Sequence, residues 1–157
     1  MIEPLIDSVT RKLAENPGDV LAWEAIPLAR YQALLPESIR SSWAFVLRAN
    51  VVTGAERHPN SHQRMVSFRG YGDFQTQPAG EWVSHYLTSD PSAALEERWI
   101  SIPQNVWHQC VVGPMDWAVV SFHTVAEREL IEERPASDVS GPARQRWYSR
   151  DLAPRLK

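Results

Sequence analysis

Four side chains that could bind a metal stand in two short stretches of the sequence. Glu56 and His58 are two residues apart, His62 follows a Pro-Asn-Ser turn, and His108 comes much later in the chain. Positions two apart on a strand share a face, so the Glu56 carboxylate and the His58 imidazole are expected side by side. The turn can return His62 toward them, and a later strand can bring His108 across a sheet. The four residues therefore predict one site.

Such a site offers three imidazole nitrogens and one carboxylate oxygen. This set suits a divalent transition metal, namely iron, zinc, nickel, copper or manganese, and hardly suits calcium or magnesium. The four ligands would leave one or two coordination positions open for water, dioxygen or substrate. An open position is what permits Lewis-acid polarisation or oxygen activation.

These residues need a sheet to hold them, and most of the sequence is typical of one. The 157 residues include 12 prolines, 7 glycines and 7 tryptophans, which indicates short strands broken by turns with aromatic side chains packed between sheets. Strands are expected over residues 43–52, 64–75, 81–87, 97–102, 106–112, 117–123 and 128–132. This spacing predicts a sandwich or a closed barrel.

The two ends of the chain have different patterns. Apolar residues recur at helical spacing over residues 4–16, and a second helical stretch is expected over residues 23–35. Residues 1–38 are therefore expected to be a helical segment packed on a β-barrel of residues 39–134. Residues 135–157 are expected to be a solvated tail, or alternatively a strap docked through Trp147 and Tyr148.

At the histidines the sequence resembles the cupin superfamily, small β-barrels with two short motifs on facing strands. The first motif reads His-x-His, three or four residues, Glu, six residues, Gly; Glu56-Arg57-His58 stands at its start and Gly70 at its end. The second reads Pro-x-Gly, two residues, His; Pro103, Asn105 and His108 match its spacing. Asn105 takes the place of the glycine, because asparagine tolerates a positive φ. The resemblance implies a mainly β, jelly-roll barrel over residues 43–132.

The first motif does not decide whether His62 or Gln63 is a metal ligand. Six residues separate Gln63 from Gly70, so the motif places Gln63 where cupins have their glutamate. Alternation favours His62 instead, because a strand with His62 inward also turns Arg64 and Phe68 inward, on the more apolar face. The expected metal ligands are Glu56, His58, His62 and His108, with Gln63 as the alternative to His62.

Alternation also selects side chains that would line the pocket. With His108 inward, Cys110 shares its face and is expected to be buried and inert. On the strand 117–123, one face carries Ser121 and His123. The expected pocket residues are Arg64, Phe68, Cys110, Ser121 and His123.

Cupins include dioxygenases, isomerases, lyases, sugar-binding regulators and storage proteins, so the fold does not name a reaction. The first hypothesis is a metal-dependent enzyme on a small organic molecule, with oxygenation the chemistry that the resemblance most often implies. The second is a non-catalytic cupin that binds a small ligand as a sensor, since Glu56 replaces the first histidine of the motif. The resemblance also implies a homodimer.

Charge and hydropathy exclude other classes. The chain has 16 Lys and Arg against 19 Asp and Glu, which gives no electrostatic case for a nucleic-acid partner. No apolar run approaches the roughly 20 residues of a membrane helix, and the N-terminus lacks the pattern of a signal peptide. A single cysteine fits a reducing compartment. A cytoplasmic protein without a membrane partner is therefore expected.

Overall fold

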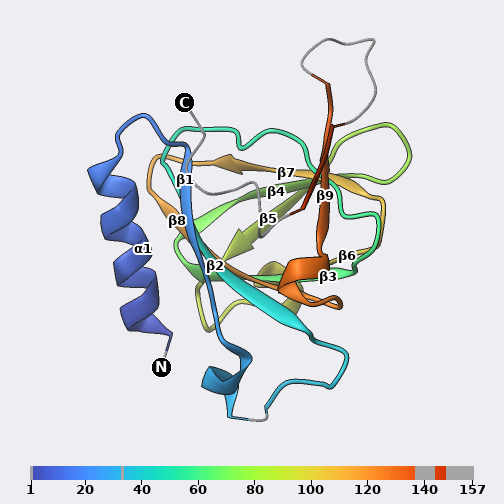
Figure 1. The fold of residues 1–157 in the computed structure, drawn as a ribbon. Helices are drawn as coiled ribbons and strands as arrows, with labels where there is room; N and C mark the ends of the chain where they lie inside the picture. The colour runs from blue at the N-terminus through green and yellow to red at the C-terminus, as the bar shows by residue number, and fades with distance from the viewer. Residues whose placement is uncertain (1, 33, 137–143, 148–157) are drawn as a thin grey trace.

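The computed structural model describes residues 2–32 and 34–136, together with the backbone of residues 144–147. Two antiparallel sheets face each other, and a helix covers the outer side of the larger sheet (Figure 1). The elements in chain order are α1 (Glu3–Glu15), β1 (Leu21–Ala25), the 3-10 helix η1 (Leu28–Tyr31), β2 (Ser41–Leu47), β3 (Gln63–Arg69), β4 (Tyr71–Gln77), β5 (Val83–Thr88), η2 (Leu95–Glu97), β6 (Trp99–Ile102), β7 (Trp107–Val112), β8 (Trp117–His123), η3 (Glu127–Glu129), β9 (Ile131–Arg134) and β10 (Arg144–Trp147).

The larger sheet has the order β1-β2-β8-β3-β6, and the smaller sheet has the order β5-β4-β7. The chain passes from one sheet to the other at Gly70, whose φ of 89° favours glycine. For this reason the single strand expected over residues 64–75 is divided into β3 and β4. The other predicted strands are present with shifted ends, and the mainly β fold class is confirmed.

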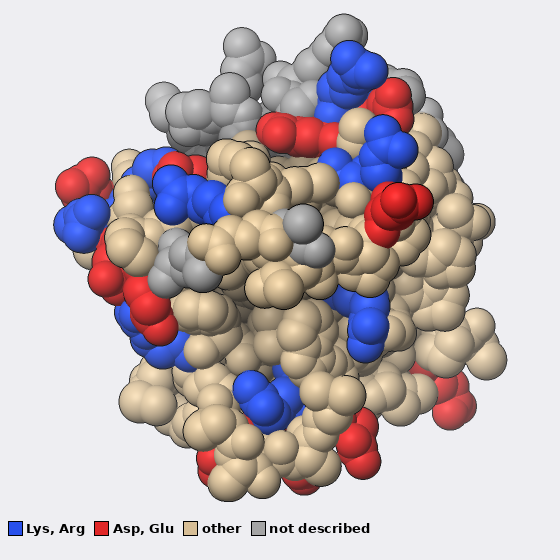
Figure 2. Space-filling model, turned by 90° about the horizontal axis from the view of Figure 1, so that it is seen from below, with Lys and Arg blue, Asp and Glu red and all other residues tan. Residues whose placement is uncertain are grey.

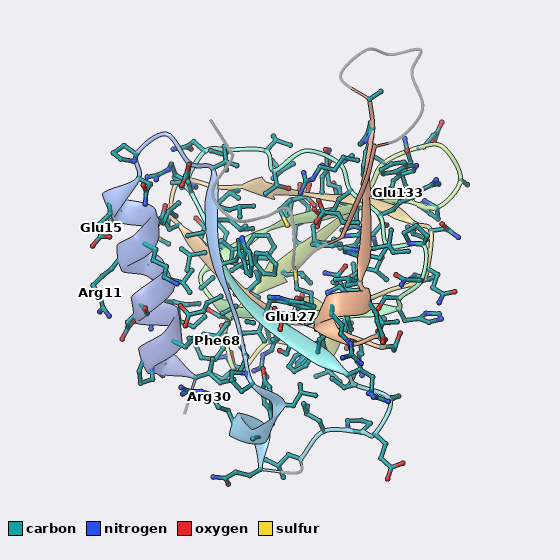
Figure 3. The ribbon with its side chains drawn as sticks, viewed as in Figure 1. Arg11, Glu15, Arg30, Phe68, Glu127 and Glu133 are labelled. Carbon is teal, nitrogen blue, oxygen red and sulfur yellow. The ribbon has the colours of Figure 1, made fainter. Side chains whose placement is uncertain are left out.

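Strand β8, in the middle of the larger sheet, is buried on both faces because α1 packs on the outer side of the sheet. On β8, Trp117 and Val119 face the smaller sheet, whereas Ala118 and Val120 face α1. Every residue of β8 is therefore buried. The helix presents Leu5, Ile6, Val9 and Leu13 to the sheet. Figure 3 shows Arg11 and Glu15 on the opposite, outward side of the helix.

The second predicted helix is wrong. Residues 21–25 form β1, an edge strand that pairs antiparallel with β2, and only residues 28–31 make a 3-10 turn. Leu21 and Trp23, two positions apart, both line the interior. Residues two apart share a face on a strand, whereas on a helix they point in different directions. Only a strand can therefore direct both Leu21 and Trp23 into the interior.

The C-terminal part adds a hairpin. Strand β9 pairs with β10, and Glu133 of β9 also bridges to Arg57 in the segment before β3. The possible docking of Tyr148 and the Trp147 side chain lies outside the described residues.

The molecular surface carries mixed charge. Figure 2 shows acidic and basic side chains interspersed on one face, and neither sign gathers into a patch there. Among the described residues, no helix combines the length and the apolar character needed to cross a membrane.

Candidate metal centre

Glu56 and His58 lie on an extended segment between β7 and β9. The Glu56 backbone exchanges two hydrogen bonds with His108 of β7, and Arg57 exchanges two with Glu133 of β9. The segment therefore alternates as a strand does. Glu56 and His58 face the interior, whereas Arg57 faces out and lies over the Trp107 ring at 4.6 Å.

A tight turn sets the position of His108 at the start of β7. Asn105 has a φ of 63°, which confirms the positive φ expected where the cupin motif has its glycine. The Asn105 backbone N–H donates to the carbonyl oxygen of His58 at 3.1 Å. The turn and the segment that carries the first two ligands are thus tied to each other.

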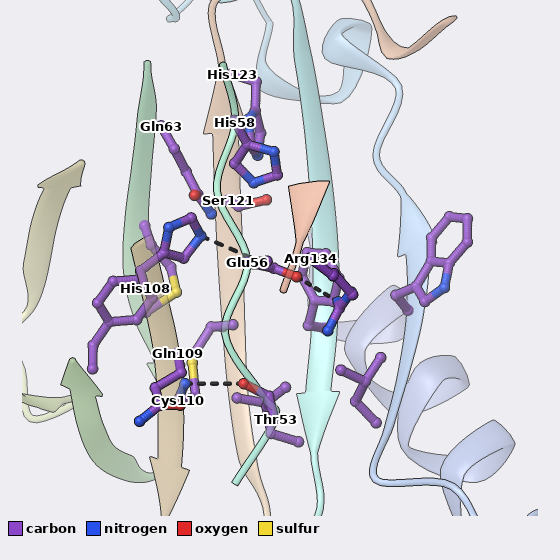
Figure 4. A pocket seen from close by; sticks show the side chains of 17 residues that line it. Thr53, Glu56, His58, Gln63, His108, Gln109, Cys110, Ser121, His123 and Arg134 are labelled. Atoms are coloured by element: carbon purple, nitrogen blue, oxygen red, sulfur yellow. Dashed lines mark hydrogen bonds and ion pairs between the residues drawn. The ribbon is translucent and has the colours of Figure 1, made fainter. Parts of the chain in front are cut away.

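Three of the predicted ligands converge (Figure 4). One ligand atom from each of Glu56, His58 and His108 lies within 4.8 Å of the other two. The His108 Nε2 and Glu56 Oε1 atoms are 3.5 Å apart, and the rings of His58 and His108 are 5.3 Å apart between centroids. This group could hold a metal ion.

Backbone carbonyls fix the tautomers of both histidines. His58 Nδ1 lies 3.1 Å from the Ile131 carbonyl oxygen, and His108 Nδ1 lies 3.0 Å from that of Val106. A carbonyl oxygen only accepts, so each Nδ1 carries a proton and donates it. Each neutral ring therefore has its lone pair on Nε2, the atom that a metal would bind.

The His108 Nε2 atom is the observation that most favours a cation at this site. It is buried and makes no hydrogen bond within the described part of the chain. Because Nδ1 carries the proton, Nε2 carries a lone pair, and this lone pair faces Glu56 Oε1 at 3.5 Å. Two hydrogen-bond acceptors at this distance repel each other. Two ligands at about 2.1 Å from one metal stand roughly 3.0 to 3.5 Å apart. The spacing of these two atoms fits a metal between them.

Arg134 sets the charge state of Glu56. Burial raises the pKa of this carboxyl, but the opposing charge of its neighbours, the Arg134 guanidinium foremost, holds the pKa well below its usual value. Arg134 Nη2 lies 2.5 Å from Glu56 Oε2, which leaves Oε1 facing His108. Glu56 is therefore ionised, as a ligand must be.

Burial keeps His58 and His123 neutral. The pKa of His58 is about 4, because burial and, to a smaller extent, the neighbouring His108 lower it by more than Glu56 raises it. Burial also lowers the pKa of His123, whose ring lies edge-on to His58 at 4.9 Å. Neutral imidazole is the form that binds metals.

The three residues stand in a cavity of about 60 Å³ between the sheets. His58 and His108 are 4% and 2% exposed, whereas the side chains of Glu56 and Arg134 are about a quarter exposed, so the cavity opens beside that ion pair. The lining residues are Leu21, Trp23, Phe45, Leu47, Thr53, Glu56, His58, Gln63, Met65, Phe74, His108, Gln109, Cys110, Val119, Ser121, His123 and Arg134.

The structure departs from the prediction that His62 faces the site. His62 is exposed, and Gln63 is buried and lines the cavity. Arg64 is also exposed, stacked beside Trp99, and Phe68 packs toward α1. The alternation of β3 favoured the wrong face because the outer face of the strand is also partly buried, against the cluster that includes α1. The more apolar face of the strand is the one under the helix.

The other pocket residues lie where alternation on their strands puts them. Cys110, Ser121 and His123 all line the cavity. Burial raises the pKa of the Cys110 thiol well above its usual value, so the thiol stays protonated. Sequence reasoning missed Arg134, whose contact with Glu56 spans most of the chain. The only available signal was the alternation of Glu132 and Arg134 in a short strand.

No protein-family model and no curated protein matches the sequence, whereas solved structures match it by fold. CapF with the inhibitor 3-isopropenyl-tropolone aligns with a TM-score of 0.53 at 13% identity, over 68% of this chain and 28% of CapF. An oxalate oxidase in complex with glycolate aligns with a TM-score of 0.51 at 13% identity, over 67% and 51%. An 11S globulin from Wrightia tinctoria aligns with a TM-score of 0.52 at 16% identity, over 70% and 26%.

These likenesses concern the fold. The chain spans about half or less of the length of each of these proteins. All three are cupins, and what they share with this chain is the pair of facing antiparallel sheets described above. The chain has the cupin fold, as the two spaced motifs predict.

Proposed function

We propose that Glu56, His58 and His108 bind a divalent transition metal and that the protein is an enzyme acting on a small organic molecule in the cavity. The observation that carries the proposal is the buried, unbonded His108 Nε2 facing an ionised carboxylate. A bound redox-active ion such as iron or manganese would supply activation of dioxygen, and zinc would supply Lewis-acid polarisation. The oxalate oxidase among the fold neighbours favours the first.

The chain's own residues have separate roles in this proposal. The Ile131 and Val106 carbonyls hold the two imidazoles, and Arg134 holds Glu56 ionised and turned toward His108. The two sheets exclude water from the histidines and leave access at the Glu56 side. A small molecule entering there meets the metal ligands first.

A non-catalytic, ligand-binding cupin is the second candidate. It is favoured by Gln63, an uncharged amide where the cupin motif has a carboxylate, which leaves three ligands in place of four. The 11S globulin among the fold neighbours is described with an auxin binding site. A cytoplasmic location is part of the proposal, supported by a single, buried cysteine.

Metal analysis of the purified protein tests the metal centre. We expect the wild type, expressed without a histidine tag, to carry close to one metal per chain by inductively coupled plasma mass spectrometry. His108→Ala removes a ligand and should lower the content at least tenfold. His62→Ala is the matched control, because His62 is exposed and outside the cavity.

Circular dichroism checks that both variants fold. Equal metal content in His108→Ala and wild type would overturn the centre. Iron in the wild type would favour the oxygenase, and a protein that binds small ligands but no metal, even after reconstitution, would favour the second candidate.

A further inference from the structure

The cavity contains two further buried polar atoms that the metal centre does not use. Gln63 Oε1 and Ser121 Oγ are buried and have no hydrogen-bond partner within the described part of the chain. Gln63 is 7% exposed and Ser121 is 1% exposed, and both line the cavity. A buried polar atom without a hydrogen-bond partner destabilises the fold, so a pair of them in one wall calls for an occupant.

The two atoms belong to one wall. Ser121 of β8 is opposite Met65, and Gln63 of β3 is opposite His123, so Gln63 and Ser121 are diagonal neighbours on the same face. Figure 4 shows both side chains directed toward the space beside His58 and His108. A ligand that contacts one of them can reach the other.

Other polar residues of the cavity already have partners. Thr53 Oγ1 accepts from the Cys110 backbone N–H at 3.0 Å, and Gln109 Nε2 donates to Gln75 Oε1 at 2.9 Å. The unsatisfied pair is therefore not a general property of the lining. It marks a particular place beside the metal ligands.

Charge and polarity limit what this wall can bind. The formally charged residues among the described lining are Glu56 and Arg134, and they pair with each other at 2.5 Å. Among the described lining residues, no cationic side chain remains to bind the carboxylate of an anionic ligand. Gln63 Oε1 only accepts, so the ligand must bring an O–H or an N–H, while the Ser121 hydroxyl can donate or accept. Much of the remaining lining is aliphatic or aromatic.

We propose that Gln63 and Ser121 form a hydrogen-bonding subsite for the hydroxyl or carboxamide group of an uncharged small molecule with an apolar body. The subsite rests on the proposed role of the cavity in ligand binding, and it does not require the metal. Gln63 then binds the organic ligand and is not the replacement for a fourth metal ligand.

Binding of simple probes to the metal-free protein tests the subsite. Isothermal titration calorimetry after EDTA treatment measures benzamide and, for comparison, toluene, which has the same ring without the polar group. Gln63→Leu and Ser121→Ala should each weaken benzamide binding about fivefold, the equivalent of about 1 kcal/mol for one hydrogen bond. Toluene binding should stay within twofold. Gln104→Leu is the control, since Gln104 is exposed and lies outside the cavity.

Two results would overturn the subsite: no benzamide binding by the wild type, or equal binding by Gln63→Leu. Zinc titration of Gln63→Leu separates the subsite from the metal centre. We expect zinc affinity within threefold of wild type, and a loss of tenfold or more would make Gln63 a metal ligand and overturn the subsite while keeping the centre. Benzamide binding by a wild type that binds no zinc would support the subsite and overturn the metal centre alone.

Discussion

His58 and His108 are held by main-chain oxygens, and this has a consequence for the apo protein. The Ile131 and Val106 carbonyls accept the Nδ1–H of the two rings, so each ring is oriented with Nε2 as its ligand atom before any metal binds. A ligand set that needs little rearrangement binds its ion with less loss of conformational entropy. The metal centre is therefore preorganised by its backbone.

The neutral histidines make the stability of the metal-free protein depend on pH. In the unfolded chain a histidine has a pKa near 6.5, whereas His58 in the fold has a pKa of about 4. Between these values the unfolded chain binds more protons, so the free energy of unfolding falls as pH falls from about 6.5 to 4. The loss from His58 alone is about 3 kcal/mol when complete, and His123 shifts in the same direction.

Urea denaturation of EDTA-treated protein between pH 7 and pH 4.5 measures this slope. His58→Phe should reduce it, and His62→Ala, which alters an exposed histidine, should leave it as in wild type. A free energy of unfolding that does not change between pH 6.5 and pH 4.5 would contradict the buried, neutral state of His58.

At the residue scale, the sequence predicted what local spacing determines. Two-residue alternation placed Glu56 and His58 together, and the motif count placed His108 and the positive φ of Asn105. The motif count placed Gln63 at the site, whereas alternation did not, because the more apolar face of β3 is the one that packs toward α1 and no local pattern reveals that contact.

At the scale of elements, β4 and β8 approach each other closely where Trp117 is buried. A Cβ added at Gly72 would lie 2.3 Å from the Trp117 ring, which is fully buried and whose indole N–H donates to Ser67 Oγ at 2.8 Å. This hydrogen bond and the burial of the ring hold it in place. The missing side chain at Gly72 therefore sets the distance between the two sheets.

Gly72→Ala should destabilise the fold through this overlap. Overpacking of a buried site costs about 1–3 kcal/mol, and the fixed ring places this substitution at the upper end. Gly18→Ala is the matched control, because an added Cβ there has no neighbour within 4 Å, and its effect should stay within about 0.5 kcal/mol. Guanidinium denaturation compares the two, and equal stability of both variants would show that the sheets can separate without cost.

The elements also show where sequence patterns are ambiguous. The strands of the interior were predicted because their alternation and turn residues agree. The local pattern of β1 favours a helix, because the pairing of β1 with β2 comes from residues that follow in the chain and leaves no local signature. The same is true of the contact between Arg134 and Glu56, which joins two distant segments.

At the scale of the whole molecule, β5 forms an edge of the smaller sheet and carries exposed apolar side chains. Val83 and Tyr86 are 45% and 77% exposed, and Trp82 beside them is 39% exposed. Open edge strands with such side chains tend to pair with another chain. We predict a homodimer, with twice the 17.9 kDa of one chain in sedimentation velocity at micromolar concentration.

A charge on the edge tests this arrangement. Tyr86→Lys replaces an exposed side chain and should give the mass of a single chain without loss of folding. Arg11→Glu, on the outward side of α1, is the control that should not change the mass (Figure 3). A wild type that sediments as a single chain would remove the prediction.

The hairpin strand β9 supplies the Ile131 carbonyl that holds His58 and the Arg134 guanidinium that holds Glu56. A metal that binds His58 and Glu56 in this arrangement therefore disfavours local unfolding of β9, because metal binding and local unfolding are linked equilibria. Amide hydrogen exchange should therefore slow in β9 when zinc is added, at the Glu133 N–H above all, which donates to the Arg57 carbonyl. Amides of β8 should exchange at the same rate with or without zinc. The amide exchange rate of β9 then reports the fraction of protein that has metal bound.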